Sequence, residues 1–434
     1  MDINTFIHQN SDRDVNSLRL SMKKGHYDFD TELALTQIEC RQKYRAKLHD
    51  FLEHPDFLFP DTVSGEQASH QGVARYHASL AEGYSRILDM TAGLGIDAFS
   101  FAKTGAEVTA IELNPAKAEI LKKNVTTLNL PNLTAINADS ISYLKDDFER
   151  RIPSMEGKPL TTQSQDLERM TSGYKSMIFI DPARRDATNK RVYNLRDCSP
   201  DVLENQELLL KFAEKVLIKA SPLLDITQTI KDFPAISAIR TVGVKGECKE
   251  VLIELSKVKP ESGKPVMTEE EQETSKEKSG SGILLEAINL DTDGRILSKF
   301  QTRTSSSQTF NTLQSLPSNE PSYLLEPSAM VMKLAPWEEI SSRYNAEKLG
   351  KSSHLFITDT LPQDFPGRVT KILKVIKKQD RKSLAGLPAS VISRNHPLKA
   401  EEIRKTFKLK EGDQYFIYAT RIGDLPIIFL SERV

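Results

Sequence analysis

The chain has 434 residues, of which 27% are charged and 38% hydrophobic, and its formal net charge is −1. This length suits two to four folded domains, and the composition excludes a chain that is disordered or basic throughout. The three cysteines, Cys40, Cys198 and Cys248, lie far apart without a Cys-x-x-Cys pattern. Their spacing argues against a disulfide framework and against a metal site, so no metal is expected.

No stretch of the sequence has the pattern of a membrane segment. No uncharged apolar run approaches the roughly 18 residues that a membrane-spanning helix needs. Acids at Asp2, Asp12 and Asp14, with no apolar stretch beside them, argue against a signal peptide. We therefore expect a cytoplasmic protein without membrane partners.

Residues 1–84 are predicted to form a helical N-terminal domain. Asp30 is a typical cap for a helix that runs through the residues after it. A second helix is predicted over residues 64–80. On this helix, Arg75 or Tyr76 is expected to face a ligand pocket in the next domain.

From residue 85 onward, strand and helix patterns alternate. Asn114-Pro115 marks one helix start, with Asn as the cap and Pro at the first helical position. Short apolar runs predict strands at residues 87–90, 108–113, 133–138, 177–180, 216–220, 236–242 and 251–255. Strands that alternate with helices predict an α/β fold with a doubly wound, mostly parallel sheet over residues 85–255.

Two polar segments separate the predicted folded parts. Residues 149–175 are rich in Pro, Gly, Ser and Thr, which predicts a surface loop, and residues 256–282 have the composition of a flexible linker. Two small α+β modules are predicted beyond the linker, at 283–355 and 356–434. Residues 363–434 carry 15 Lys and Arg against 8 Asp and Glu, so the last module is basic and is a candidate for polyanion binding.

Acidic residues stand at or just beyond the carboxyl ends of the first four strands of the predicted sheet. They are Asp89, Glu112, Asp139 and Asp181. Ligands of open α/β sheets bind outside those ends. The first acid could pair with a ligand ammonium, the second could accept hydrogen bonds from ribose hydroxyls, and the third could accept one from an adenine amine. A single acid after a strand is more often a cap or turn residue, so the prediction depends on the four together.

A Gly-rich turn follows the first predicted strand and brings backbone N–H groups close to a ligand. Its pattern Gly93-x-Gly95-x-x-Ala98 also satisfies the dinucleotide fingerprint, with Glu112 as the ribose acid. An NAD-dependent oxidoreductase is therefore an open alternative. That fingerprint gives no role to the other three acids, and the basic tail suits a polymeric substrate better than a small alcohol.

Four motifs, in order, resemble those of class I S-adenosylmethionine-dependent methyltransferases. Asp-Met-Thr-Ala-Gly-Leu-Gly at 89–95 is similar to the first motif, Ala-Ile-Glu-Leu at 110–113 to the ribose-binding motif, Asn-Ala-Asp-Ser at 137–140 to the adenine-side motif, and Ile-Asp-Pro-Ala-Arg at 180–184 to the fourth motif. The resemblance implies a Rossmann-like domain that binds S-adenosyl-L-methionine. It implies the cofactor-binding residues Asp89, Thr91, Ala92, Gly93, Gly95, Glu112, Leu113, Asp139 and Ser140.

The whole chain further resembles a bacterial group with a helical N-terminal region, a ferredoxin-like module and a C-terminal THUMP-like domain. Stretches that carry this resemblance lie at 37–47, 66–80, 181–186, 198–201, 247–250 and 366–368. It assigns the ferredoxin-like module to 283–355 and the THUMP-like domain to 356–434. Because THUMP domains are associated with RNA, the resemblance implies that tRNA or rRNA is the methyl acceptor. Transfer of a methyl group from a sulfonium is expected to be direct and in line. Lys371, Lys374, Lys377, Lys378, Arg381 and Lys382 form the basic cluster predicted to hold the RNA backbone.

Catalysis is assigned to Asp181 and Pro182, with Arg184 and Arg185 as candidates for binding a substrate phosphate. Enzymes that methylate exocyclic base amines usually carry a second Pro and an aromatic residue in this motif. Ala183 and an arginine stand there instead, so the acceptor atom stays open. A third interpretation is a non-catalytic RNA-binding scaffold that retains the cofactor pocket.

Overall fold

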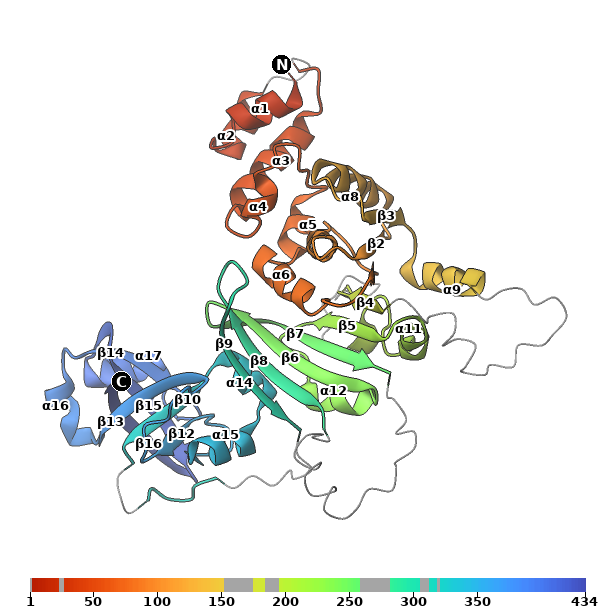
Figure 1. Ribbon diagram of the computed structural model, residues 1–434. Coiled ribbons are helices and arrows are strands. Elements are labelled where there is room, and N and C mark those ends of the chain that lie inside the picture. The colour runs from red at the N-terminus through yellow and green to blue at the C-terminus, as the bar shows by residue number, and fades with distance from the viewer. Residues whose placement is uncertain are drawn as a thin grey trace, which may run out of the picture. The chain divides into compact units, whose positions relative to one another are not determined.

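The computed structural model describes residues 2–22, 27–151, 175–183, 195–257, 282–304, 312–317 and 321–434, and Figure 1 shows their helices and strands. The chain divides into two compact units: residues 1–245, 249–271 and 290–297 form the first, and residues 246–248, 272–289 and 298–434 form the second. Most of the predicted surface loop and linker lies outside the described residues. Within the described ranges, no helix is long and apolar enough to cross a membrane.

Short helices make up the N-terminal region, as predicted. They are α1 (Ile3–Gln9), α2 (Val15–Ser21), α3 (Thr31–Tyr44), α4 (His49–Leu52), α5 (Thr62–Gln67) and α6 (Gln71–Ser79). Asp30 caps α3 by accepting hydrogen bonds from the backbone of Glu32 and Leu33. The single helix predicted over 64–80 is wrong: it is two helices, because the His70 side chain accepts from Gly72 N and starts a new helix there. This break brings residues 68–70 close to the sheet.

The first unit contains the α/β sheet. Its strands are β1 (Arg86–Asp89), β2 (Glu107–Glu112), β3 (Leu133–Asn137), β4 (Ser176–Ile180), β5 (Lys215–Ala220), β6 (Ile236–Val244) and β7 (Glu247–Ser256). The connecting helices are α7 (Ile96–Ala102), α8 (Pro115–Thr127), α9 (Ser140–Arg151), η1 (Leu195–Asp197), α11 (Gln206–Phe212) and α12 (Ile226–Asp232). Asn114 caps α8 and Pro115 opens it, as predicted. The fold class predicted from the sequence is confirmed.

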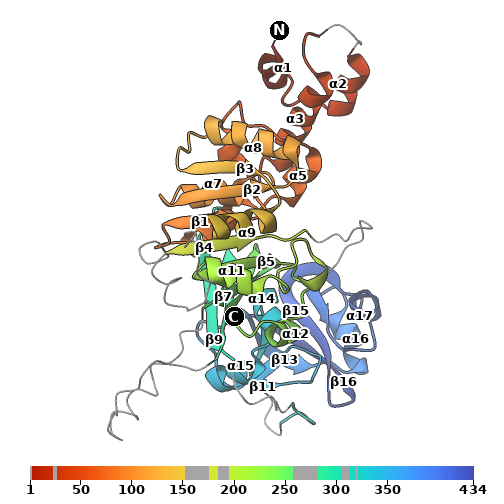
Figure 2. The same ribbon diagram turned by 90° about the vertical axis from the view of Figure 1, so that its right-hand side faces the viewer.

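Strand order separates this sheet from a dinucleotide-binding one. The sheet has nine strands, in the order β3-β2-β1-β4-β5-β7-β6 followed by β8 (Leu284–Leu290) and β9 (Ile296–Arg303), and Figure 2 shows β3, β2, β1 and β4 side by side. The pairs β1–β2, β2–β3, β1–β4 and β4–β5 are parallel, whereas β7 pairs antiparallel with β5. The classic dinucleotide-binding order is 3-2-1-4-5-6. The antiparallel strand inserted next to β5 departs from that order and disfavours the NAD alternative.

The second unit contains another sheet. Its elements from residue 323 onward are β10 (Tyr323–Pro327), α14 (Ala329–Leu334), α15 (Trp337–Tyr344), β11 (Glu347–Lys348), β12 (Phe356–Thr358), β13 (Gly367–Val375), η2 (Lys378–Asp380), α16 (Arg381–Leu384), β14 (Pro388–Ser393), α17 (Ala400–Phe407), β15 (Lys410–Ile422) and β16 (Leu425–Arg433). Seven strands pair in the order β11-β12-β10-β13-β16-β15-β14.

The pairing of β10 matters for the two predicted modules. This strand lies between β12 and β13 and is antiparallel to both. Strands from both sides of the predicted boundary at residue 355 therefore share one sheet. The chain ends in a hairpin, in which β15 and β16 pair antiparallel from Tyr415 to Ile422 on the β15 side.

Candidate functional site

The Gly-rich turn lies between β1 and α7, at the carboxyl edge of the parallel strands. Gly93 and Gly95 both have positive φ, at +54° and +94°. A Cβ on Gly95 would lie 2.5 Å from Phe99 Cζ and would also overlap with Leu121. Only glycine satisfies both the conformation and the space at this second position.

Asp89, at the end of β1, is almost fully buried beneath this turn. Its Oδ1 accepts a hydrogen bond of 3.0 Å from Thr91 N. Burial, followed by repulsion from Asp97, raises the pKa of Asp89 well above its usual range. The nearby Lys219 opposes this rise without cancelling it, so the side chain holds a proton more tightly than an exposed aspartate does. A ligand ammonium would reverse that preference.

Glu112, at the end of β2, lies across the turn from Asp89. One carboxylate oxygen accepts from Gly93 N at 3.1 Å, and the other accepts from Asn114 N at 2.7 Å. This acid therefore ties the Gly-rich turn to the start of α8. The next residue, Leu113, is 67% exposed, which leaves an apolar side chain available to pack against a flat ligand group.

Asp139 follows β3 and precedes α9. Its Oδ1 accepts from Ser142 N at 2.8 Å, which is the hydrogen bond of a helix cap. Ser140 is the first residue of the helix and is buried. Of the four predicted acids, this one has the structural role that a single acid most often has, and its carboxylate remains exposed to solvent.

Asp181 follows β4, which lies beside β1. Its backbone N donates to Thr91 Oγ1 at 2.7 Å, which links the fourth motif to the first. Pro182 is buried, and Ala183 forms a β-bridge with Ser199. The predicted phosphate ligands Arg184 and Arg185 lie outside the described residues.

A buried chain of polar side chains leads away from Asp181, and sequence reasoning missed it. Lys219 Nζ, near the end of β5, donates to Asp181 Oδ2 at 2.6 Å and to Ser69 Oγ at 3.0 Å. Ser69 Oγ donates to Asp97 Oδ2 at 2.6 Å. The two ring nitrogens of His77 lie 2.7 Å from Asp97 Oδ1 and 2.5 Å from Glu250 Oε1. We call these residues, with Asp89, the carboxylate network.

Charges in the carboxylate network stabilise one another. Burial disfavours a charged imidazole, but Glu250 and Asp97 raise the pKa of His77 to about 10. Burial also disfavours a charged lysine, yet Asp181 and Asp97 raise the pKa of Lys219 above its usual range. Four carboxyl groups lie near these two cations and the neighbouring Lys47, so the described residues of the network have a surplus of acid.

The sequence did contain a signal for Lys219. This lysine follows the apolar run Val216-Leu217-Ile218 inside a predicted buried strand, and a lysine is almost never fully buried unless it is paired. Asp97 lies in the Gly-rich motif itself. By contrast, no local pattern indicates that Ser69 or His77, in the helical N-terminal region, reaches this site.

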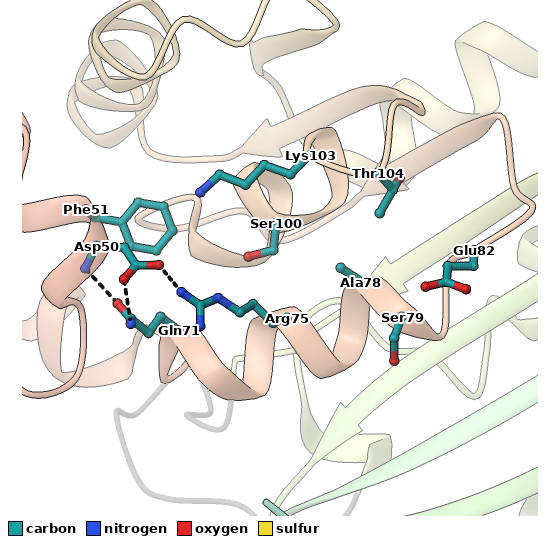
Figure 3. A pocket seen from close by; sticks show the side chains of 10 residues that line it. All are labelled: Asp50, Phe51, Gln71, Arg75, Ala78, Ser79, Glu82, Ser100, Lys103 and Thr104. Carbon is teal, nitrogen blue, oxygen red and sulfur yellow. Dashed lines mark hydrogen bonds and ion pairs between the residues drawn. The ribbon is translucent and has the colours of Figure 1, made fainter. Parts of the chain in front are cut away.

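A pocket of about 210 Å³ in the first unit lies away from this edge. Figure 3 shows that Arg75 and Gln71 point from α6 toward Asp50, while Lys103 lies over the Phe51 ring. The Arg75 guanidinium pairs with Asp50 and donates to the backbone O of Asp293, and the expectation that Arg75 or Tyr76 faces the ligand stays a prediction. The pocket contains none of the predicted site residues.

Comparisons with known protein families agree with the geometry at the sheet edge. A family described as "Putative SAM-dependent methyltransferase" matches residues 38–159. A ferredoxin-like domain family matches residues 323–366, and a THUMP domain-like family matches residues 367–433. The three matches follow the order that the sequence resemblance implies. The predicted domain boundaries stay a prediction.

Curated relatives cover part of the chain. The ribosomal RNA small subunit methyltransferase J of Hydrogenovibrio crunogenus is 28% identical over 194 residues, which are 42% of this chain and 63% of that protein. The ubiquinone/menaquinone biosynthesis C-methyltransferase UbiE of Zymomonas mobilis is 40% identical over 65 residues, or 14% of this chain and 27% of its own. Both are methyltransferases, but their named products differ.

A solved structure from a bacterium aligns with the whole chain. The crystal structure of a "putative methyltransferase from Porphyromonas gingivalis W83" aligns with a TM-score of 0.77 at 22% identity, covering 100% of this chain and 97% of that one. At this identity the likeness concerns the fold. It extends the architecture described above, including both units, to a second chain.

Proposed function

We propose an acceptor and a mechanism for this chain from the premise that it belongs to the S-adenosylmethionine-dependent methyltransferases and carries ferredoxin-like and THUMP-like domains after the central one. S-adenosyl-L-methionine is the cofactor of that family. The proposed function is methyl transfer from this cofactor to RNA. The observation that carries the proposal is the acid surplus at the carboxyl edge of β1 and β4, beside the Gly-rich turn.

The residues at that edge suit the charge and shape of the cofactor. Asp89 is a buried carboxyl without a cation within its hydrogen bonds, and we assign it to the ammonium of the methionine part. Backbone N–H groups of the Gly93 turn lie close to Glu112, which we assign to the ribose hydroxyls. The exposed Leu113 and Asp139 would then flank the adenine. Thr91, Ala92, Gly95 and Ser140 complete the proposed lining.

Methyl transfer itself is an in-line displacement. When bound, the cofactor supplies a methyl group on a positively charged sulfur. A lone pair of the acceptor forms the new bond to carbon as the carbon–sulfur bond breaks, and its electron pair stays on sulfur. We assign Asp181 to orienting the acceptor and taking its proton, with Pro182 fixing the backbone at that position.

RNA is the proposed acceptor for two independent reasons. Relatives that share the central domain include proteins named as ribosomal RNA methyltransferases. In the second unit, Lys371, Lys377, Arg381 and Lys382 are exposed along β13 and α16, while Lys374 pairs with Asp380 at 2.9 Å. Such a group of cations suits a phosphate backbone. The small-molecule acceptor named for the UbiE relative gives no role to these cations.

A single experiment tests both halves of this proposal. The full chain is incubated with radiolabelled S-adenosylmethionine and total RNA fractions, and labelled nucleosides are then mapped. We expect label in a defined nucleoside of tRNA or rRNA, with RNA binding that weakens steeply as salt rises. No label in any RNA fraction, despite binding of S-adenosylhomocysteine by calorimetry, would overturn the RNA assignment. If the chain bound NADH and did not bind S-adenosylhomocysteine, the assignment of S-adenosylmethionine as the cofactor would be wrong.

A further inference from the structure

The carboxylate network contains a buried lysine that the cofactor roles leave unused. Lys219 is 7% exposed, and its Nζ donates to Asp181 and to Ser69. The lysine belongs to the central sheet, whereas Ser69 lies in the break between α5 and α6. Lys219 thus contacts the proposed acceptor-binding Asp181 and is also held by Ser69, which belongs to the N-terminal region.

Another lysine on the same strand shows what a purely structural pair looks like. Lys215 begins β5, and its Nζ pairs with Glu254 at 3.1 Å and donates to Leu80 O at 2.9 Å. Its side chain is 11% exposed, against 8% for Lys219. Glu254 has a second cation, Arg240, at 2.7 Å. Removing this lysine would leave its carboxylate paired.

Asp181 differs because, within the part of the chain that the structure describes, the other charged groups beside it are acids. Asp89 and Asp97 lie close enough to repel a charge at this edge, and Glu250 is the next carboxylate along the network. The neighbouring cations are committed elsewhere: His77 lies between Asp97 and Glu250, and Lys47 donates to the backbone O of Gly65 and Glu66. Lys219 is therefore the cation that offsets the Asp181 charge among the described residues.

We propose that Lys219 is a positioning residue that pairs with the Asp181 carboxylate, offsets its charge and aims it at the acceptor, and that Ser69 and His77 hold this lysine in place through Asp97. This inference rests on the proposed function and deepens it. Lys219 uses Oδ2 of the aspartate, so the other oxygen, Oδ1, is the one turned to the acceptor and its proton. The N-terminal helical region then serves the reaction by completing the site, in addition to any contact it makes with RNA.

A first test needs no RNA. Thermal unfolding of the full chain is followed from pH 5 to pH 9 for Lys219→Met, for the matched control Lys215→Met, and for Lys219→Met combined with Asp181→Asn. Without the ammonium, the aspartate faces other carboxyls and takes up a proton more readily. We expect the melting temperature of Lys219→Met to fall, relative to wild type, as pH rises through this range. Adding Asp181→Asn should remove that extra fall, and Lys215→Met should show a constant offset.

A second test follows methyl transfer. In Lys219→Met we expect kcat at pH 7 to drop by about 100-fold, since a protonated aspartate cannot accept the acceptor's proton. Activity should recover by up to about tenfold for each unit of rising pH, while the KM for S-adenosylmethionine stays within about threefold. Ser69→Ala should show a smaller shift in the same direction. Lys215→Met should keep the wild-type pH profile.

The outcomes separate the two proposals. If wild type methylates no RNA, the proposed function fails, and the unfolding series still decides whether Lys219 controls the ionisation of Asp181. If Lys219→Met and Lys215→Met share one pH dependence in unfolding, the inference is wrong whatever the RNA result. A loss of kcat in Lys219→Met that no pH restores would also overturn it, because that points to collapse of the site.

Discussion

Each unit of the molecule contains a cluster of charged side chains that includes a buried carboxyl group, and the two clusters have opposite surpluses. In the first unit, Asp89, Asp97, Asp181 and Glu250 face the two cations Lys219 and His77. In the second, Glu326 accepts from Arg368 at 3.0 Å, from Arg394 at 2.6 Å and from the Tyr418 hydroxyl at 3.1 Å. The first cluster has more acidic groups than cations, and the second has more cations than acidic groups.

The difference shows why burial and a shifted pKa do not by themselves mark a site. Tyr418 also has a raised pKa, first because it is buried and then because Glu326 is near, yet its hydroxyl donates to Glu326, a carboxylate that two guanidinium groups also bind. Asp89 has only a backbone partner and a raised pKa. An unsatisfied carboxyl next to a Gly-rich turn suits a cationic ligand. The positive surplus of the second unit suits an anionic one.

The largest expected effect comes from the acid that links the network to the reaction. Replacing Asp181 with Asn should lower kcat by about 10²–10⁴-fold, because a general base of this kind contributes that much. Affinity for S-adenosylhomocysteine should change little, since the amide keeps its shape. Steady-state kinetics with the RNA substrate and calorimetry with the product measure the two quantities.

Asp225 provides a matched control for this substitution. It caps α12, just beyond β5, by accepting from Gln228 N at 3.0 Å. Asp225→Asn should leave kcat within about twofold, because Asn is as good a cap as Asp. A wild-type kcat in Asp181→Asn would remove this aspartate from the chemistry and favour the scaffold interpretation.

Replacing Gly95 with alanine tests whether the Gly-rich turn depends on the backbone conformation and tight packing at this position. An alanine there has to adopt a φ of +94° and to displace Phe99 and Leu121. Strain and overpacking together should cost about 3 kcal/mol of unfolding free energy and weaken S-adenosylhomocysteine binding.

Gly105 provides the control for this substitution. It has a φ of +90°, but a Cβ added to it would have nothing within 4 Å. Gly105→Ala should therefore cost only the strain, about 1–2 kcal/mol, and equal losses in urea unfolding would refute the packing account.

Glu326→Gln tests the second cluster. It leaves two guanidinium groups without their carboxylate, and we expect a loss of about 2 kcal/mol in urea unfolding. A fully buried pair would cost more, but Arg368 is 43% exposed and solvent screens its charge. Affinity for S-adenosylhomocysteine should not change. A change in that affinity would mean that the two clusters do not act separately.

Sequence patterns predicted the central sheet well because the signals there are local. Apolar strand runs, the Asn114-Pro115 helix start and the Gly-rich turn each lie within a few residues. The acids at strand ends were also found, since parallel strands bring their carboxyl ends to one edge. The network through Ser69 and His77 could not be found this way, because it joins residues up to 173 positions apart. Pairing of β10 with β13 is hidden for the same reason.

Asp89 gives the smallest and most diagnostic effect, which concerns pH. Its pKa is raised in the free protein, so its contribution to folding is full below the usual aspartate value of 3.8 and is lost as pH rises through the folded pKa. Asp89→Asn should therefore raise the melting temperature of the ligand-free chain at neutral pH. The same substitution should remove the ion pair with the ligand ammonium. Asp89→Asn is thus expected to stabilise the ligand-free fold and to weaken ligand binding.

The pH dependence of ligand binding should have the opposite sign to the pH dependence of folding stability. Pairing with an ammonium requires the ionised carboxylate, so binding releases a proton and affinity rises with pH, by up to about tenfold per unit, until the free protein is already ionised. Calorimetry with S-adenosylhomocysteine in two buffers of different ionisation enthalpy measures the proton release directly. Asp89→Asn should bind more weakly and release none. Equal proton release from both proteins would mean that Asp89 is not the carboxyl that pairs with the ligand ammonium.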